Sequence, residues 1–248
     1  MMFTELPFLD RFAAARDCGF DAVEYLFPYE FSPEEIASRL ERNKLTQALF
    51  NLPPGNWSAG ERGLASIPGR EDEFREGVAN ALRYALATGV KRLHVMAGLG
   101  SLNDSSSLAT YRANIAYAAE MLAQNKIDLL LEPINGRNMP GYALNSVDYA
   151  ASLIKSLAIP NLKLQFDIYH CQIIHGDVTM RLRAHMPIIG HVQIASVPSR
   201  HEPDTEELNY PFLFDELDRL GYSNFVGCEY NPRGKTDEGL QWFQPWRR

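Results

Sequence analysis

Four oxygen-bearing side chains stand at the ends of apolar runs that have the character of buried strands. Glu132 follows three leucines in LLLEPIN, Asp167 closes LKLQFD, Gln193 lies in GHVQIA and Glu229 ends VGCE. The segments between these runs have the length and periodicity of helices, and alternating strands and helices build a parallel sheet. In a closed barrel the C-terminal ends of the strands converge on one mouth. We therefore expect the four side chains to meet there.

A cluster of this composition predicts a divalent cation. Three carboxylates without an obvious basic partner repel one another, and burial of uncompensated charge is very unfavourable. For Glu132 or Asp167 alone, a salt bridge to a neighbouring arginine explains the residue equally well, but the matching strand-end positions favour a shared ion. All-oxygen ligands, with Gln193 as the neutral one, favour Mg²⁺ or Mn²⁺ over Zn²⁺. The pattern is typical of a metal-dependent enzyme.

Other polar residues are expected at the same mouth. His170 lies just beyond a strand end, so we expect a loop histidine that hydrogen-bonds the substrate. Arg200, in SVPSRHEPD, could hold a substrate carboxylate through two parallel hydrogen bonds. A solvated surface arginine is the alternative. His191 points to the same face as Gln193 but one layer deeper, and His94 is expected to pack inside the barrel.

The segment 51–70, NLPPGNWSAGERGLASIPGR, is long and rich in Gly and Pro. Loops longer than about 12–15 residues inside compact domains are usually lids or binding loops. Asn51 and Trp57 are the candidate substrate contacts in it, and Glu61 and Arg62 are its other chemically useful members. A lid would keep water from a reactive intermediate. The alternative is a surface excursion without function.

Composition narrows the class of partner. The net charge of −7 and the lack of a basic stripe argue against nucleic acid, whose binding depends on phosphate neutralisation. Cys18, Cys171 and Cys228 have no CxxC spacing, which fits a reducing cytoplasm and disfavours disulfides or a thiolate zinc site. There is no signal-peptide pattern and no apolar run near 18 residues. We expect a cytoplasmic enzyme with a small-molecule substrate and no membrane partner, and a homo-oligomer is compatible with the sequence.

The elements that would position these residues form a series of strand and helix units. With 248 residues, the chain fits one α/β barrel of about 250 residues, so we expect a single domain over 1–248. The predicted strands are 21–28, 45–51, 91–97, 128–134, 162–169, 188–195 and 224–230. Between them, Ser32-Pro33-Glu34-Glu35 is a capping box that opens a helix. Apolar residues recur every four positions in 71–88, namely Phe74, Val78, Leu82 and Leu86.

The N-terminus departs from a complete barrel. Residues 1–7 are too short and irregular for a strand with its loop, and Phe8, Phe12 and Ala15 already show helical spacing. The expected fold is therefore a (β/α)8-type TIM barrel that lacks most or all of its first strand, which leaves two strand edges open. The sequence leaves open whether a strand lies upstream or a partner covers the gap.

With these motifs in order over nearly the whole chain, the sequence resembles the hydroxypyruvate isomerase family of xylose isomerase-like barrels. The stretches that carry the resemblance are FDAVEYLFPY, GERGLASIPGRE, LLLEPIN, QFDIYH, GHVQIA, RHEPD, ELNYPFLF and VGCEYNPRG. The 2-oxo-tetronate isomerases are a close sister group. RHEPD followed by NYPFLF is more similar to that group, whereas LEPIN is more similar to hydroxypyruvate isomerase.

The resemblance implies a set of roles. The two catalytic glutamates of the family fall on Glu132 and Glu229, and the metal ligands on these two together with Asp167 and Gln193. It also implies interconversion of hydroxypyruvate and 2-hydroxy-3-oxopropanoate (tartronate semialdehyde) by glutamate-mediated proton transfer through an enediolate. A hydride shift is the alternative chemistry, and 2-oxo-tetronate is the alternative substrate.

There are also departures from the related ketose 3-epimerases, whose substrate-contacting positions match His170 and Arg200. Those enzymes carry histidine at the Gln193 position and an additional acidic residue near Asn138, which argues against a long ketose substrate here. A DNA-repair nuclease of the same superfamily would need a histidine-rich zinc site and a basic groove. A non-catalytic barrel, disabled by the lack of the first strand, is the alternative outside the enzymes.

Overall fold

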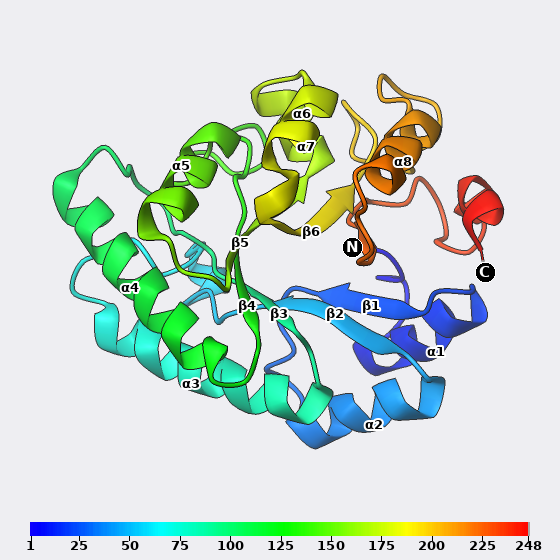
Figure 1. Cartoon of the computed structure of the whole chain (residues 1–248). Coiled ribbons are helices and arrows are strands. Elements are labelled where there is room, and N and C mark those ends of the chain that lie inside the picture. The colour runs from blue at the N-terminus through cyan, green and yellow to red at the C-terminus, as the bar shows by residue number, and fades with distance from the viewer. Residues whose placement is uncertain (248) are drawn as a thin grey trace.

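A computed structural model describes residues 1–247 as seven parallel strands in a nearly closed barrel, with helices around the outside (Figure 1). The strand order follows the chain from first to last, and each strand pairs with the next in parallel. The strands are β1 (Ala22–Tyr25), β2 (Thr46–Asn51), β3 (Arg92–His94), β4 (Asp128–Leu131), β5 (Leu162–Asp167), β6 (Ile189–Ile194) and β7 (Val226–Cys228). All seven predicted strands are confirmed, but they are shorter, because residues at the ends of the predicted ranges already belong to loops and helices.

Helices alternate with these strands. The α-helices are α1 (Arg11–Asp17), α2 (Pro33–Asn43), α3 (Glu71–Thr88), α4 (Ser105–Ala123), α5 (Val147–Leu157), α6 (Ile168–Ile174), α7 (Val178–His185) and α8 (Tyr210–Arg219). Short 3-10 helices are η1 (Phe8–Asp10), η2 (Trp57–Ala59), η3 (Met186–Ile188) and η4 (Leu240–Trp246). Within residues 1–247, no helix combines the length and the apolar character needed to cross a membrane.

Local sequence explains where α2 begins. The Ser32 hydroxyl accepts the backbone N–H of Glu35 at 3.2 Å, and the Glu35 carboxylate accepts the backbone N–H of Ser32 at 3.0 Å. Pro33 occupies the first helical position, where its missing N–H is not needed. The predicted capping box is therefore confirmed.

The predicted apolar face of α3 is partly wrong. Phe74 and Val78 are buried as expected, but Leu86 is 59% exposed, and Tyr84 and Ala85 are buried instead. Each step of four residues advances the side chain by about 40° around a helix of 3.6 residues per turn. After three such steps from Phe74, the residue reached is Leu86, and its side chain no longer lies on the buried face of the helix.

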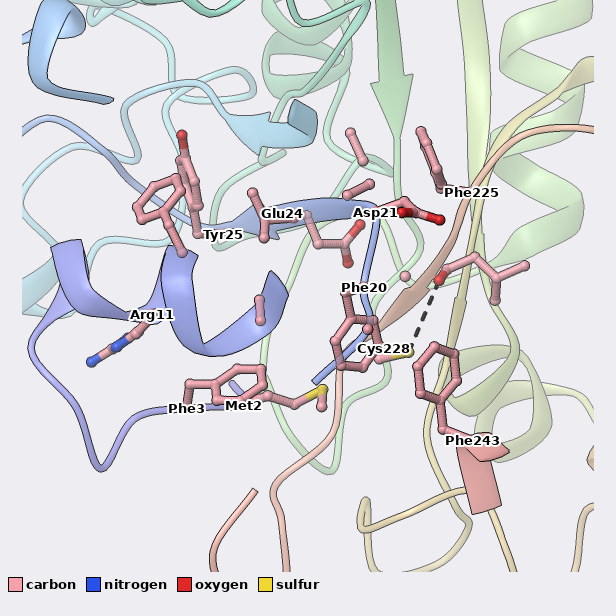
Figure 2. A pocket seen from close by; sticks show the side chains of 18 of the residues that line it. Met2, Phe3, Arg11, Phe20, Asp21, Glu24, Tyr25, Phe225, Cys228 and Phe243 are labelled. Atoms are coloured by element: carbon pink, nitrogen blue, oxygen red, sulfur yellow. Dashed lines mark hydrogen bonds between the residues drawn. The ribbon is translucent and has the colours of Figure 1, made fainter. Parts of the chain in front are cut away.

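The barrel is open between its first and last strands. β1 and β7 are the two ends of the sheet, and a cavity of about 510 Å³ lies against both, lined by residues such as Phe3, Tyr25 and Phe225 (Figure 2). The chain before β1 forms turns, η1 and α1 rather than a strand. The expectation of a barrel lacking its first strand is confirmed in this respect.

Strand alternation places polar groups inside the barrel near its mouth. Along β5, Leu164 and Phe166 belong to the apolar core against the helices, while Gln165 and Asp167 occupy the alternate positions. All four side chains are buried. The residues that point out of the barrel therefore pack the sheet against the helices. The residues that point into the barrel can form the site.

Candidate metal centre and active site

The strand ends bring the predicted residues to one mouth. Asp167 is the last residue of β5, and the sheet register pairs it directly with Gln193 of β6. Glu132 and Glu229 are the first residues after β4 and β7. Ligand atoms of Glu132, Asp167, Glu229 and His170 all lie within 4.8 Å of one another. The convergence expected from the strand ends is present in the structure.

Two buried carboxylate oxygens in this cluster lack hydrogen-bond partners within residues 1–247. Asp167 uses one oxygen, Oδ1, to cap α6, where it accepts the backbone N–H of Tyr169 at 2.7 Å and that of His170 at 3.4 Å. Its other oxygen, Oδ2, and Oε1 of Glu132 have no partner. Buried acceptors are nearly always satisfied, and carboxylate oxygens are preferred ligands of Mg²⁺ and Mn²⁺. The donor set therefore fits a divalent cation.

His170 lies in the first turn of α6 and not in a loop, so that prediction was wrong. Helix α6 begins directly after β5, because Asp167 is both the end of the strand and the helix cap. The ring Nδ1 lies 2.6 Å from the side-chain amide nitrogen of Asn135, and Nε2 lies 3.6 Å from Oδ2 of Asp167. Since an amide NH₂ can only donate, a neutral His170 carries its proton on Nε2. This proton points at the carboxylates, which suits a hydrogen-bond donor.

Burial and mutual repulsion shift the titration of the cluster. Burial raises the pKa of Glu132 well above its usual value, and the charges of Glu229 and Asp167 raise it further. Burial also raises the pKa of Asp167 to about 6, although Arg200 opposes the shift. The pKa of Glu229 is raised by burial as well, again against Arg200. Without a compensating cation, the three carboxylates resist full ionisation.

Arg200, which was expected at the mouth as a substrate contact, is also a basic partner of the carboxylates. Its Nη2 donates to Oε2 of Glu229 at 2.7 Å and lies 3.9 Å from Oδ2 of Asp167, and its guanidinium sits 4.9 Å from the centre of the Tyr169 ring. The side chain is only 14% exposed, which rules out a solvated surface arginine. The expectation of carboxylates without a basic partner was therefore wrong, because this contact joins residues far apart in the chain.

Comparison with known proteins gives the family. The family model described as xylose isomerase-like TIM barrel matches residues 12–246. The chain belongs to this xylose isomerase-like family. A 2-oxo-tetronate isomerase from Cupriavidus necator is 54% identical over 248 residues, covering 99% of this chain and 95% of the relative. A hydroxypyruvate isomerase from Escherichia coli is 47% identical over 249 residues, covering 100% and 96%.

A solved structure from Brucella melitensis, described as an AP endonuclease of family 2, has a TM-score of 0.97 and 51% sequence identity. The match covers 100% of this chain and 96% of that one. The two curated relatives, both named isomerases, show that this xylose isomerase-like barrel is an enzyme of the isomerase group.

Two residues of this xylose isomerase-like barrel lie beside the site but were not predicted there. His94 ends β3, is buried, and has its Nε2 3.7 Å from Oε2 of Glu132, with neither ring nitrogen hydrogen-bonded. It faces the site and is not merely packed in the barrel. Burial lowers the pKa of the imidazoles of both His94 and His170 to about 3, so both are neutral.

Glu24 of β1 is the second unpredicted residue. Its Oε2 lies 2.6 Å from Nε2 of His191, and its Oε1 accepts Nε2 of Gln193 at 2.9 Å. Burial by itself raises the pKa of Glu24, but the charge and hydrogen bond of His191 bring it below the usual value. The contact supports the expected place of His191 one layer below Gln193. The signal in the sequence that could have indicated this role is the position of Glu24, a charged residue inside the apolar run DAVEYLFP.

The long loop after β2 is organised by its own contacts. Asn51, at the end of β2, is buried, and its carbonyl accepts the Tyr29 hydroxyl at 2.6 Å. Trp57 packs edge to face against Phe27 at 5.2 Å, and the guanidinium of Arg62 lies 3.9 Å from the centre of the indole. These contacts order the loop but do not join Trp57 to the carboxylates. The substrate contacts predicted for Asn51 and Trp57 stay predictions.

Proposed function

We propose that the protein is a divalent-metal-dependent isomerase of short 2-oxo acids that carry a hydroxyl group on the carbon next to the carbonyl. The first candidate reaction is the interconversion of hydroxypyruvate and 2-hydroxy-3-oxopropanoate. The observation that supports this most strongly is the convergence of Glu132, Asp167 and Glu229 at the barrel mouth. Buried oxygens of Glu132 and Asp167 there have no hydrogen-bond partner among the described residues. It agrees with the isomerase names of the two curated relatives.

The residues proposed to hold Mg²⁺ or Mn²⁺ are Glu132, Asp167, Gln193 and Glu229. When bound, the ion would polarise the substrate carbonyl and offset the negative charge that develops during proton transfer. Gln193 suits the fourth place because it lies beside Asp167 in the sheet register. His170, with its proton on Nε2, is better suited to donate a hydrogen bond to a substrate oxygen than to ligate the ion.

Proton transfer is assigned to Glu132 and Glu229. For hydroxypyruvate, one carboxylate removes a proton from C3, and the electron pair of that C–H bond forms the double bond of an enediolate between C2 and C3. The other glutamate delivers a proton to C2, while the hydroxyl proton moves from the C3 oxygen to the C2 oxygen. The product carries its aldehyde at C3. Such positioned acid–base groups contribute about 10²–10⁴-fold to the rate.

The acid group of the substrate is assigned to Arg200. One of its nitrogens donates to Glu229, but its Nε is buried without a partner. A guanidinium offers five donors in a planar fork that matches a carboxylate. The guanidinium donors of Arg200 that Glu229 does not use therefore support a 2-oxo acid over a neutral ketose as substrate.

The second candidate substrate is 2-oxo-tetronate, which differs from hydroxypyruvate by a hydroxymethyl group on C3. The 54% identity to a 2-oxo-tetronate isomerase favours it. Both substrates undergo the same proton transfer, so the assignment of residues is common to them. The remaining expectations are a small-molecule substrate, no nucleic-acid partner and a cytoplasmic location, which the three free cysteines fit.

The test is proton NMR of hydroxypyruvate, and separately of 2-oxo-tetronate, in D₂O with chelator-stripped protein that is then resupplied with Mg²⁺ or Mn²⁺. We expect metal-dependent consumption of one substrate with deuterium entering the product carbon, and no reaction with E132Q. Turnover without deuterium incorporation would indicate a hydride shift. No turnover of either substrate with metal present would overturn the proposal and favour a non-catalytic barrel.

A further inference from the structure

We propose that Glu24, seated against Gly227, fixes the side-chain amide of Gln193 so that its oxygen rather than its NH₂ group is presented to the cation site. Glu24 thereby acts as a positioning residue, since it acts through Gln193 and does not itself belong to the ligand set. The inference rests on the metal dependence proposed above. It assigns a role to two residues that the reaction itself does not require.

The orientation follows from the chemistry of the contacts. The Gln193 Nε2 donates to Oε1 of Glu24 at 2.9 Å, and an ionised carboxylate can only accept. The NH₂ group of the amide must therefore face β1. Gln165 donates its own Nε2 to Oε1 of Gln193 at 2.6 Å, which requires the same orientation. An amide oxygen has two lone pairs, so one is left for a cation.

A glutamine ligand needs such a device more than a carboxylate does. The NH₂ and oxygen ends of an amide have nearly the same shape, so packing alone does not distinguish them. If the amide turned by 180°, two N–H donors would face the Glu132 and Asp167 side of the site, where a cation is expected. The Glu24 carboxylate lies on the other side of the amide and can only accept hydrogen bonds. It therefore disfavours the turned orientation, in which the Gln193 oxygen would face it.

Glu24 is itself held in place from two directions. Its Oε2 contacts Nε2 of His191 at 2.6 Å, directly below Gln193 on β6. On the other side, a Cβ atom at Gly227 would overlap both oxygens of the Glu24 carboxylate. The register of β6 and β7 pairs Gly227 with Gln193.

The backbone at Gly227 does not adopt a positive φ, so conformational freedom does not explain this glycine. The glycine is explained instead by the space that the Glu24 carboxylate occupies beside it. Figure 2 shows Glu24 projecting from β1 into the cavity between β1 and β7, which that side chain helps to line. A side chain at 227 would compete with the carboxylate for this space.

The first test measures Mn²⁺ affinity by electron paramagnetic resonance of the free ion, using the full chain. G227A leaves every ligand and every charge unchanged but displaces the Glu24 carboxylate. We expect it to weaken Mn²⁺ binding by about 10–100-fold, as for loss of groups that orient metal ligands. G234A is the matched control, because a Cβ at Gly234 meets no atom within 4 Å, and its affinity should equal that of the wild type.

A second pair of variants separates orientation from loss of structure. E24Q should also weaken Mn²⁺ binding, because an amide at position 24 can donate to the Gln193 oxygen and so favour the turned amide. The exchange variant E24Q/Q193E should restore binding, since a carboxylate at position 193 presents an oxygen in either orientation. This comparison decides the question by itself if G227A does not fold, as judged by circular dichroism.

Wild-type affinity in folded G227A, or in E24Q, would overturn the role of Glu24 while leaving the metal site intact. Failure of E24Q/Q193E to restore binding would overturn it too. Absence of stoichiometric Mn²⁺ binding by the wild type would overturn the proposed metal dependence and this inference together, so the two failures are distinguishable.

Discussion

The guanidinium of Arg200 and the carboxylate of Glu229 form an ion pair of 2.7 Å that joins the loop after β6 to the end of β7. The pair places a positive charge at a site otherwise rich in carboxylates. It also leaves part of the guanidinium unused, because Nε has no partner. We therefore expect the proposed substrate carboxylate to bind Arg200 without first breaking the contact with Glu229.

R200K should raise KM for the 2-oxo acid by about tenfold or more, because a hydrogen bond to a charged group contributes about 1.5–3 kcal/mol and lysine lacks the planar fork. Steady-state kinetics with the preferred substrate measures this. R42K, a change of the same type at an exposed residue of α2, should leave KM within about twofold, because among residues 1–247 this arginine neither stacks nor binds a carboxylate. An unchanged KM in R200K would exclude Arg200 as the carboxylate-binding group.

E132Q and E229Q should each lower turnover by at least about 100-fold, since acid–base catalysis by a positioned carboxylate contributes about 10²–10⁴-fold. Both should remain folded, because removing a charge from the crowded cluster relieves repulsion. E216Q is the control, at a buried glutamate that pairs with Arg183 away from the site. Near-normal turnover in E132Q or E229Q, measured by substrate NMR, would refute the assigned role.

Metal affinity should rise with pH between about 5 and 7. In the metal-free protein the pKa of Asp167 is raised to about 6, and metal binding requires the deprotonated carboxylate. Because the folded state binds this proton more tightly than the unfolded state, the contribution of Asp167 to stability falls as pH rises from the ordinary value, 3.8, through about 6.

Thermal unfolding at pH 5 and pH 7, with and without Mn²⁺, tests both parts of this expectation. The stabilisation by Mn²⁺ should be larger at pH 7. D167N should raise the melting temperature of the metal-free protein at pH 7 and abolish the effect of the ion, whereas D72N, on the exposed side of α3, should do neither. A response to Mn²⁺ that is independent of pH would contradict the titration assigned to this site.

Substrate binding should shift the fluorescence of Trp57 to shorter wavelength if the loop after β2 acts as a lid. The indole is 37% exposed in this structure, and closure would remove it from water. W57F should abolish the shift, while W246F, at a similarly exposed tryptophan in η4, should retain it. An equal shift in wild type and W57F would remove Trp57 from the proposed lid.

S32A should lower the free energy of unfolding by about 1 kcal/mol, the usual effect of losing an N-cap side chain, and leave kcat unchanged. The hydroxyl caps α2 by accepting the backbone N–H of Glu35. S106A, at an exposed serine in the first turn of α4, should have little effect on denaturant unfolding. Equal stability of the two variants would show that the capping contact contributes little.

Patterns local in the chain determined the architecture. The seven strands, their order and the capping box at Ser32 depend on residues within a few positions of one another, so periodicity and turn chemistry were enough to predict them. The same holds for the strand-end places of Glu132, Asp167, Gln193 and Glu229, because parallel strands deliver their C-terminal residues to one mouth.

Only the tertiary structure decided which other residues complete the site. Arg200 reaches Glu229 across 29 positions of the chain, and Gln193 reaches Glu24 across 169. Such contacts depend on how loops and barrel walls pack in space, and no local pattern encodes them. The approach of His94 to Glu132 is of the same kind. The chain by itself therefore determined the carboxylate centre, while folding decided that Arg200 pairs with Glu229 and that Glu24 contacts the amide of Gln193.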